Sequence, residues 1–318
     1  MTPNQIAHRC WFLTGPTASG KTAIGLELAE RLDAEIISLD SMAIYRGMDI
    51  GTAKPTVEQR QLVPHHLIDI RNPNERFSVS NYLELATKMI DKIHQRGRTV
   101  LFVGGTPLYL KTLLRGLFEG PPADETLRQE VLKEAAETGS AALHQRLAMV
   151  DPVSAAKIHP NDLRRIVRAL EVYRHTGEPI SHQQLQFDDG HPATACRVFV
   201  LDWPRAKLHN RINQRVDQMF DQGLVGEVEQ LLNLHGELSR TALQAVGYQE
   251  VVKHLQQGVP LEKTIQDTKT RTRQFAKRQL TWFRSLGECR WEPRADEICE
   301  EKTATRILQA GSTLTPNP

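Results

Sequence analysis

Cysteine is scarce in this sequence of 318 residues, which has four cysteines and no two of them spaced as Cys-x-x-Cys. That spacing is typical of zinc-binding knuckles and thiol redox motifs, so neither kind of site is predicted. Four separate thiols in a chain of this size fit the reducing environment of the cytoplasm. We therefore expect a cytoplasmic protein.

Long apolar runs are also lacking. Stretches such as 36–39 and 100–103 are far shorter than the roughly 20 residues of a membrane-spanning helix. The N-terminal stretch MTPNQIAHRCWFLTG has no basic start followed by a long apolar run, which argues against a signal peptide. Membrane proteins and secreted proteins are therefore not the expected classes.

A strong net charge is missing as well. The formal charge is +2 and the pI about 8.3, which is too mild to identify a nucleic-acid-binding protein from composition alone. Hydrophobic residues make up 40 % of the chain and charged residues 25 %, an ordinary soluble composition that fits one large domain or two smaller ones. The function must therefore be inferred from motifs.

Strands and helices alternate in the first third of the chain. Residues 10–14, 36–39 and 99–105 have the short apolar pattern of buried strands, and residues 81–95 have helical spacing. This alternation predicts an α/β fold with a parallel sheet covered by helices.

The pattern changes at EGPPADE (119–125). From there to about residue 190 only helical spacing is found, and RVFVLDW at 197–203 then returns to strand character. We expect a disordered tail at 311–318. The predicted parts are a first part of a P-loop catalytic core at 1–118, an all-helical insertion at 119–192, and a second part of the core with basic C-terminal helices at 193–310.

The stretch GPTASGKT (15–22) has the spacing of a phosphate-binding loop, between a predicted strand and a predicted helix. Backbone N–H groups of such a loop bind an anion, Lys21 would contact the bound phosphates, and Thr22 can ligate Mg²⁺. The candidate phosphate-binding residues are Gly15, Pro16, Thr17, Ala18, Ser19, Gly20, Lys21 and Thr22.

The acid that usually accompanies this loop is missing. In P-loop nucleoside triphosphatases another strand ends in an acidic residue that helps to hold Mg²⁺, but TVLFVGGT here ends in Gly104, Gly105 and Thr106. The carboxylate is found instead at Asp40, after the strand 36–39, where ligands bind in open α/β sheets. A turn or helix-capping role is the alternative for Asp40.

Seven stretches spread over nearly the whole chain carry a family resemblance. They are GPTASGKT (15–22), DSMAIYRGMDIGTAKP (40–55), PHHLIDI (64–70), LFVGGTPLYLKTLLRGL (101–117), RRIVRALEVYRHTGEPIS (164–181), AVGYQE (245–250) and RTRQFAKRQLTWFR (271–284). Together, and in this order, they resemble the bacterial tRNA dimethylallyltransferases, also called IPP transferases. The resemblance implies transfer of a dimethylallyl group from its diphosphate to the exocyclic amine of the adenosine just 3′ of the anticodon in tRNA.

The resemblance also implies roles for the candidate residues. The loop would hold an organic diphosphate rather than a nucleoside triphosphate, with Mg²⁺ as cofactor and Thr22 as its ligand. Asp40 matches the family's catalytic acid position and would be the general base. Thr106 would orient the amine or a phosphate oxygen, unless it only caps the next helix.

The partner implied is the tRNA anticodon stem-loop, bound by a monomer. The family often has Gln where this chain has Ala43, so any hydrogen bond of that Gln must be absent or replaced. The positions that match tRNA-contacting stretches of the family are Asp40, Ser41, Met42, Ala43, Thr106, Arg128, Arg164, Arg165, Ile166, Val167, Arg168, Gln244, Ala245, Val246, Gly247, Tyr248 and Gln249.

Two groups of basic residues are further candidates. Arg211 and Arg215 are one helical turn apart and could close over the diphosphate, or they could form an ordinary solvated helix face. Arg273 and Lys277 would face tRNA phosphates beside an apolar stripe, although basic side chains also commonly extend around a buried face. The stripe is formed by Phe275, Ala276, Leu280, Trp282 and Phe283.

Three other functions compete with tRNA prenylation. An adenylate prenyltransferase would act on a free nucleotide, which needs no basic helical insertion. A P-loop small-molecule kinase would share the loop, but the missing strand-end acid argues against it. A non-catalytic RNA-binding module would leave Asp40 and Thr106, on either side of a phosphate loop, without a role.

Overall fold

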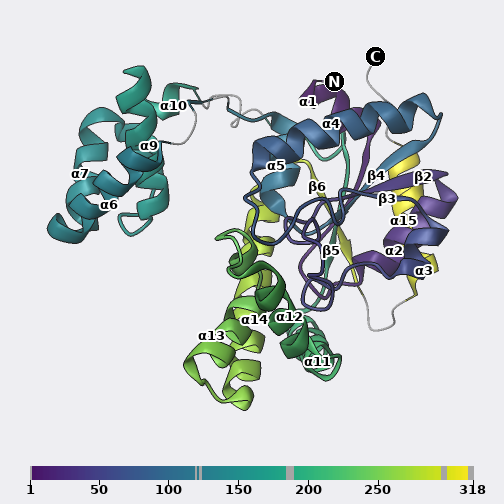
Figure 1. Cartoon of the computed structure of the whole chain (residues 1–318). Coiled ribbons are helices and arrows are strands. Elements are labelled where there is room, and N and C mark those ends of the chain that lie inside the picture. Colours follow the sequence, from purple (N-terminus) through teal and green to yellow (C-terminus); the bar gives the residue numbers. More distant parts are fainter. Residues whose placement is uncertain (1, 119, 122–123, 184–189, 295–298, 314–318) are drawn as a thin grey trace. The chain divides into compact units, whose positions relative to one another are not determined.

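The protein was analysed as a computed structural model, which describes residues 2–118, 120–121, 124–183, 190–294 and 299–313 (Figure 1). The chain forms two compact units. Unit 1 comprises Met1–Leu114 and Gly190–Pro318, and unit 2 comprises Arg115–Asp189. Unit 2 therefore begins and ends somewhat earlier than the insertion predicted at 119–192.

Unit 1 contains a parallel sheet, so the predicted α/β fold is confirmed. The six strands of the described sheet are β1 (Trp11–Thr14), β2 (Ala34–Ser38), β3 (His65–His66), β4 (Thr99–Gly104), β5 (Arg197–Asp202) and β6 (Cys289–Pro293). Their order is β3-β2-β4-β1-β5-β6, and every neighbouring pair is parallel. The sequence indicated β1, β2, β4 and β5, but β3 has only two residues and β6 (CRWEP) is largely polar, so neither gave an apolar signal.

Helices cover both faces of this sheet (Figure 1). The helical elements of unit 1 are α1 (Pro3–Arg9), α2 (Lys21–Arg31), α3 (Val57–Leu62), α4 (Val79–Gln95), α5 (Pro107–Arg115, whose last residue belongs to unit 2), α11 (Arg205–Asp221), α12 (Leu224–His235), the 3₁₀ helix η2 (Ala242–Gln244), α13 (Tyr248–Gln257), α14 (Leu261–Arg284) and α15 (Glu300–Ser312). Among the described helices, none has the length and apolar character needed to cross a bilayer.

The two faces follow from alternation along the strands. On one face, Phe12 and Phe102 pack with buried side chains of α1, α4 and α5. On the other face, Leu13 and Leu101 pack with buried side chains of α2 and α15. Because both faces are covered, these strands are apolar at nearly every position, which is why the sequence revealed them.

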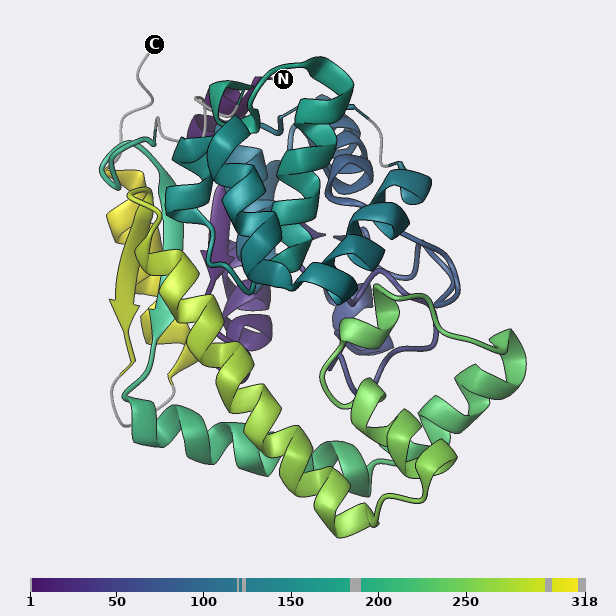
Figure 2. The ribbon, with the colours of Figure 1, turned by 90° about the vertical axis from the view of Figure 1, so that its left-hand side faces the viewer.

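Helices α11 and α14 pack against each other beside the phosphate loop (Figure 2). Leu208 and Ile212 of α11 and Ala276 of α14 form a small buried cluster. Ala18 of the loop and Trp203, which follows β5, complete it. The two helices are therefore fixed directly to the loop that is predicted to hold phosphate.

Unit 2 contains helices and connecting loops, and no strand, within its described residues. Its helices are α6 (Glu125–Thr138), α7 (Ser140–Val150), α8 (Pro152–Lys157), α9 (Leu163–Thr176) and α10 (Ile180–Gln183). Leu143, Leu147, Ile166 and Val172 are fully buried in a core of its own. On α9 nearly all residues from Ile166 to Val172 are buried, so this helix lies at the centre of the unit.

The expected disorder at 311–318 is wrong for Gly311 and Ser312, which lie in the last turn of α15. A β-carbon added at Gly311 would lie only 2.2 Å from the Trp11 ring. The absence of a side chain thus lets the helix end pack on β1, a contact with a residue 300 positions earlier that local composition does not reveal. Residues 314–318 lie outside the described part.

The carboxylate of Glu35 on β2 makes the stability of the fold depend on pH in the acid range. Its side chain is 5 % exposed and accepts hydrogen bonds from Arg96 Nε and Nη2, at 2.8 and 2.7 Å, and from His66 Nε2 at 2.6 Å. The hydrogen bonds from Arg96, with a smaller contribution from His66, lower the pKa of Glu35 to about 2. A carboxyl whose folded pKa lies below its unfolded value stabilises the fold above pH ~4.5 and loses this effect as the pH falls toward 2.

We expect Glu35→Gln to lower the free energy of unfolding at pH 7 by on the order of 2–3 kcal/mol and to flatten its decline between pH 5 and 3. Urea unfolding across that pH range measures both. Glu84→Gln is the matched control, because Glu84 is exposed and bonds only to Lys88 among the described residues. A parallel decline in wild type and Glu35→Gln would contradict the assignment.

Candidate active site

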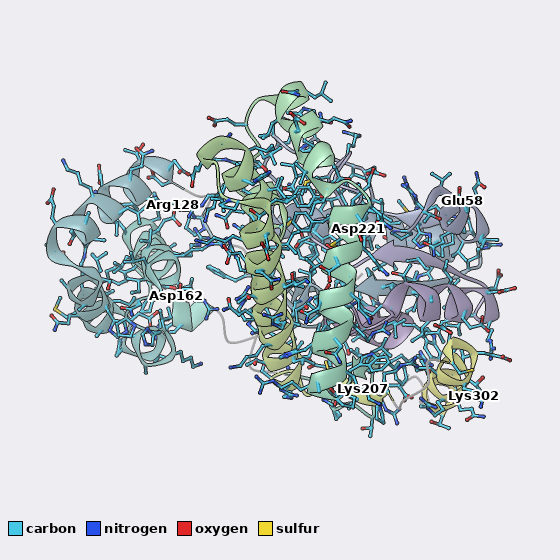
Figure 3. The ribbon with its side chains drawn as sticks, turned by 90° about the horizontal axis from the view of Figure 1, so that it is seen from below. Glu58, Arg128, Asp162, Lys207, Asp221 and Lys302 are labelled. Atoms are coloured by element: carbon cyan, nitrogen blue, oxygen red, sulfur yellow. The ribbon has the colours of Figure 1, made fainter. Side chains whose placement is uncertain are left out.

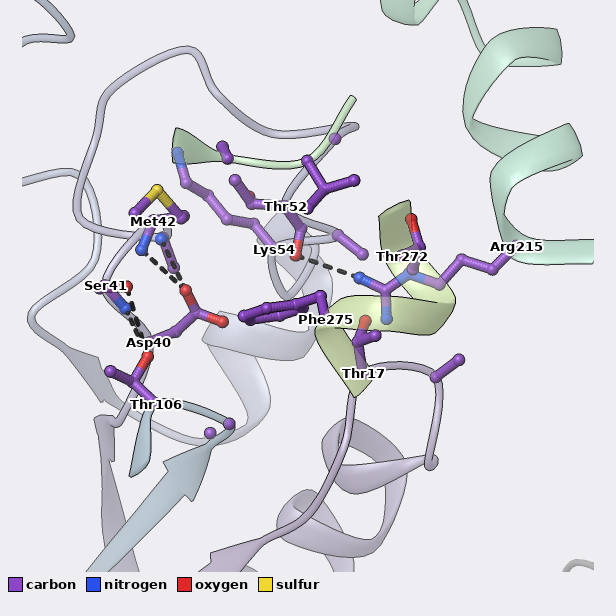
Figure 4. Close-up of a pocket in the computed structure, with 18 of the residues that line it drawn as sticks. Thr17, Asp40, Ser41, Met42, Thr52, Lys54, Thr106, Arg215, Thr272 and Phe275 are labelled. Atoms are coloured by element: carbon purple, nitrogen blue, oxygen red, sulfur yellow. Dashed lines mark hydrogen bonds between the residues drawn. The ribbon is translucent and has the colours of Figure 1, made fainter. Parts of the chain in front are cut away.

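A cavity of about 1300 Å³ lies in unit 1, where β1, β2 and β4 end. Its walls include the phosphate loop, the residues after β2 and β4, the segment 51–55, one face of α11, the segment 237–249 and one face of α14. Parallel strands place their carboxyl ends at the same edge, which brings together residues that the sequence keeps far apart. Figure 4 shows part of this cavity.

The phosphate loop joins β1 to α2. Gly20, with φ +88°, precedes the first residue of α2, Lys21. Lys21 Nζ donates hydrogen bonds to the carbonyls of Gly15 and Pro16, at 3.0 and 2.7 Å. Burial and the nearby charge of Arg215 lower the pKa of Lys21 to about 7. The loop thus encloses an ammonium group that an incoming anion would stabilise.

Both candidate arginines of α11 reach this region; the helix runs between Lys207 and Asp221 in Figure 3. Arg211 Nε donates to the carbonyl of Ala18 at 2.8 Å, and its guanidinium lies 4.6 Å from the centre of the Trp203 ring. Burial lowers the pKa of Arg211.

Arg215 lies deeper in the site. Its Nη2 donates to the carbonyl of Thr52 at 3.3 Å, while its Nε is buried and has no hydrogen-bond partner among the described residues. Burial lowers the pKa of Arg215, and the charge of Arg211 lowers it further, against the opposing effect of Asp40. Three cations around one loop, one with an unsatisfied N–H, form an environment suited to a polyanion.

Asp40 uses its two carboxylate oxygens differently. Oδ1 accepts backbone N–H bonds from Met42 at 2.8 Å and Ala43 at 3.3 Å, which is the turn role considered as the alternative. Oδ2 has no hydrogen-bond partner among the described residues, and in Figure 4 it points away from that turn. Asp40 lines the cavity. One carboxylate therefore fixes the turn and still offers an acceptor to a ligand.

Thr106 connects the ends of β2 and β4. Its Oγ1 accepts from the backbone N–H of Ser41 at 3.0 Å and lies 3.4 Å from Ser41 Oγ (Figure 4). Its own N–H donates to the carbonyl of Leu39 at 3.0 Å. Both hydroxyl groups line the cavity beside Asp40. The carbonyl of Thr106 also accepts from Leu110 in the first turn of α5.

The packing of β4 explains why its end carries no acid. A β-carbon added at Gly104 would lie 2.2 Å from the carbonyl oxygen of Leu39, and one at Gly105 would lie 2.6 Å from Gln279 Nε2. No side chain fits at Gly104 while the end of β2 stays in place. The carboxylate of this site therefore comes from β2, through Asp40.

Sequence reasoning missed Gln279 on α14. Its Oε1 accepts from the N–H of Thr17 in the phosphate loop at 2.9 Å, and its Nε2 donates to the carbonyl of Gly105 at 2.6 Å. Gln279 is 4 % exposed. A polar residue inside a basic stretch predicts a solvated surface, so the sequence gave no sign of this link between α14 and the loop.

The apolar stripe expected on α14 is wrong in part. Ala276 and Phe283 are buried, but Phe275, Leu280 and Trp282 are only half-buried. The buried face is formed by Thr264, Thr268, Thr272, Ala276, Gln279 and Phe283. The threonine hydroxyls donate to carbonyls one turn earlier, for example Thr268 to Thr264 at 2.7 Å, so they can be buried without losing hydrogen bonds. The spacing of Thr264, Thr268 and Thr272, four residues apart, was the sequence signal that could have predicted this buried face.

The residues predicted to contact tRNA in unit 1 divide into two groups. Ser41, Met42, Ala43, Gln244, Ala245, Val246 and Gln249 line the cavity. Gly247 and Tyr248 are buried instead, with Tyr248 0 % exposed, and neither lines the cavity. Arg273 is held by Asn213 Oδ1 at 2.6 Å, and Lys277 is exposed.

In unit 2 the predicted basic cluster also divides. Ile166 and Val167 are core residues, 0 and 5 % exposed, so direct contact of their side chains with RNA is ruled out in this fold. Arg128 and Arg168 both pair with Glu171, which is 0 % exposed. An unpaired buried carboxylate is costly, so these two arginines stabilise the unit.

Arg164 and Arg165 are the exposed members of that cluster. Arg165 Nε lies 3.1 Å from an Asp162 oxygen, a surface ion pair worth about 0–1 kcal/mol that a phosphate can displace. Arg168 differs from these two because it pairs with the buried Glu171, three residues further along α9.

Comparison with known proteins identifies the family. A model of the family described as IPP transferase matches residues 43–286. The chain belongs to the IPP transferase family. Among IPP transferases it is 50 % identical, over 286 residues, to the tRNA dimethylallyltransferase of Rhodopirellula baltica, covering 87 % of this chain and 86 % of the relative. It is 45 % identical to that of Carboxydothermus hydrogenoformans, covering 96 % and 98 %.

Solved structures of IPP transferases have the same fold. The full-length tRNA isopentenylpyrophosphate transferase of Bacillus halodurans is 40 % identical with a TM-score of 0.69, over 96 % of this chain and 97 % of that one. A eukaryotic dimethylallyltransferase acting on tRNA is 28 % identical with a TM-score of 0.71, over 90 % and 74 %. The predicted family membership is confirmed.

Proposed function

We propose that this protein is a tRNA dimethylallyltransferase that transfers the dimethylallyl group of dimethylallyl diphosphate to the exocyclic amine of the adenosine 3′-adjacent to the anticodon. The names of its relatives support the reaction class. One arrangement carries the proposal: a carboxylate oxygen of Asp40 faces a cavity that also contains the phosphate loop and the cations Lys21, Arg211 and Arg215. Donor and acceptor chemistry thus meet in one space.

The cations act on the leaving group. As the C–O bond of the donor breaks, the diphosphate departs with the bonding electrons, and its oxygens gain negative charge. Lys21, Arg211 and Arg215 line the cavity and stabilise that charge as preorganised donors. Thr22 lines this part of the cavity, and its hydroxyl would be an oxygen ligand for Mg²⁺, which when bound would neutralise further diphosphate charge.

The carboxylate acts on the acceptor. The nitrogen lone pair of the adenine amine forms the new N–C bond, and the amine must lose a proton to Asp40 Oδ2. Thr106 and Ser41, which bond to each other beside Asp40, hold the turn that presents this oxygen. No attacking water needs to be positioned, because the adenine amine is itself the nucleophile.

A stacked adenine does not reach a recessed carboxylate, so the target base must leave its stack. Extrusion costs a few kcal/mol, and less in a loop than in a duplex. Gln244 and Gln249 line the cavity and provide amide groups that can bond to a base edge. They are candidates to replace the Gln that the family often has where this chain has Ala43.

A direct comparison of substrates tests the proposal. Purified protein is given labelled dimethylallyl diphosphate or labelled ATP, with bulk tRNA or AMP as acceptor. We expect label from the dimethylallyl donor in tRNA only. Transfer to AMP would indicate an adenylate prenyltransferase, and transfer of phosphate from ATP would indicate a kinase. Either result would replace the proposed function.

Arg165→Ala is expected to weaken tRNA binding and to flatten its dependence on salt, by somewhat less than one unit of log–log slope if one phosphate contact is lost. The single-turnover rate at saturating tRNA should stay near wild type, because a phosphate contact is equal in ground and transition states. Salt titration of tRNA affinity and single-turnover kinetics provide the two measurements.

Arg174→Ala is the matched control on the same helix. Both arginines have side chains that are 59 % exposed, and each pairs with one surface carboxylate, Arg174 with Glu130. The control should change neither affinity nor slope. Unchanged affinity in Arg165→Ala would remove this residue as an anchor, and a collapsed chemical step with intact affinity would mean that it positions the adenine.

A further inference from the structure

The stretch RGMDIGTAKP (46–55) has no role in the chemistry above, yet it forms part of the cavity wall. Gly51, Thr52, Ala53, Lys54 and Pro55 line the cavity. Lys54 holds the stretch from the side of the sheet: its Nζ donates to the carbonyl of Tyr45 at 2.6 Å and to Asp49 and Asp69. Its side chain is 2 % exposed, so this anchor is buried.

Glu227 holds the same stretch by its backbone amides. This residue lies on α12, and its carboxylate accepts three consecutive backbone N–H bonds, from Asp49 at 2.9 Å, Ile50 at 2.7 Å and Gly51 at 3.4 Å. A carboxylate on successive amides is a strong, charge-assisted arrangement. It fixes the backbone path of the stretch relative to α12.

Tyr248 completes this anchor. Its hydroxyl donates to Glu227 Oε1 at 2.5 Å, and its ring lies directly against Gly51. A β-carbon at Gly51 would be 2.4 Å from the ring, so only glycine permits the contact. The buried Tyr248 therefore serves the 49–51 backbone, which explains why it does not face the cavity.

Thr52, the next residue, links the backbone of 49–51 to Arg215. The carbonyl of Thr52 accepts from Arg215 Nη2 at 3.3 Å (Figure 4). The Thr52 hydroxyl bonds to the carbonyl of Met48 at 2.6 Å, which keeps the turn closed. The bond to the Thr52 carbonyl is the one hydrogen bond that Arg215 makes within the described part of the chain, so the position of Thr52 decides where the guanidinium points.

We infer that Glu227 is a positioning residue for the transfer reaction: through the amides of 49–51 and the carbonyl of Thr52, it aims the Arg215 guanidinium at the donor diphosphate. The inference rests on the proposed function, because it requires that Arg215 bind the leaving group. Glu227 itself touches neither substrate. Replacing Glu227 should raise the KM for dimethylallyl diphosphate, and this effect should disappear when Arg215 is replaced as well.

A double-mutant cycle tests this dependence. Four proteins are compared: wild type, Glu227→Gln, Arg215→Ala and the double variant. The readouts are the KM for dimethylallyl diphosphate at saturating tRNA, the Kd for tRNA and the melting temperature. We expect Glu227→Gln to raise the donor KM roughly tenfold with little change in tRNA Kd. The double variant should be no worse than Arg215→Ala alone.

The outcomes separate the inference from the proposed function. If the effects of the two single changes multiply in the double variant, Glu227 does not act through Arg215 and the inference is overturned. If Arg215→Ala alone leaves the donor KM unchanged, the diphosphate role of Arg215 fails, and the inference fails with it. Glu229→Gln, an exposed change on the same helix, is the control and should match wild type.

Gly51→Ala keeps the test decisive if Glu227→Gln does not fold. This change removes no hydrogen-bonding group but forces the 49–51 backbone away from the Tyr248 ring. The same rise in donor KM, again absent in an Arg215→Ala background, is expected. A folded Gly51→Ala protein with wild-type donor KM would show that the path of this stretch does not control Arg215.

Discussion

Asp40→Asn is expected to lower the single-turnover rate, with donor and tRNA saturating, by about 10²–10⁴-fold, the usual contribution of a general base. The change is nearly isosteric. The amide oxygen of the substituted side chain would still accept from the N–H groups of Met42 and Ala43, so the turn at the end of β2 should survive. What the variant loses is the ability of Oδ2 to take the proton of the adenine amine. Rapid-quench kinetics measure the rate.

The interpretation depends on two controls. Binding of tRNA and the melting temperature should stay near wild type for Asp40→Asn, because the lost function is proton transfer. Asp91→Asn, an exposed change on α4, should leave the rate unaffected. A rate within about threefold of wild type for Asp40→Asn would remove this carboxylate from the base role and leave it as the turn residue seen in its Oδ1 contacts.

Lys21→Ala is expected to lower kcat/KM for dimethylallyl diphosphate by about 10- to 100-fold, the range for loss of a charged hydrogen bond. Affinity for tRNA should be intact, because the phosphate loop serves the leaving group. Steady-state kinetics with varied donor and a tRNA binding assay measure the two quantities. An equal loss of tRNA affinity would mean that the loop binds RNA phosphate. Lys88→Ala, on the surface of α4, is the control.

The same lysine gives donor binding a pH dependence. Its pKa of about 7 in the free site means that a growing fraction of Lys21 is neutral as the pH rises above 7. The diphosphate favours the charged form, so donor binding at pH 8 should take up a proton, and wild-type affinity should fall between pH 7 and 9. Calorimetry in buffers of different ionisation enthalpy detects the uptake. Lys21→Ala should show neither effect.

The sequence by itself determined the α/β core and predicted the phosphate loop. Strands buried on both faces are apolar at nearly every position, as in 10–14 and 99–105, and that pattern is local. The loop is defined by the spacing of Gly15, Gly20 and Lys21 within one short stretch. Asp40 was found because it follows a recognisable strand. Each of these signals lies within one short window of the chain.

The tertiary structure alone decided which polar residues serve the site. Arg128 and Arg165 look alike in sequence, but one neutralises the buried Glu171 and the other is exposed. Gln279 and Glu227 gave no signal, because the backbone groups that they hold lie more than 170 residues away.

Almost any residue type can provide a backbone amide or carbonyl, so the sequence of a segment does not show which distant side chain bonds to its backbone. The sequence of 49–52 therefore does not predict the contact with Glu227, and the sequence of the phosphate loop does not predict the contact with Gln279. Likewise, the missing acid at the end of β4 is visible in sequence, but its cause is the 2.2 Å approach of Gly104 to Leu39. Such contacts join distant segments, and only the packed fold sets their distances.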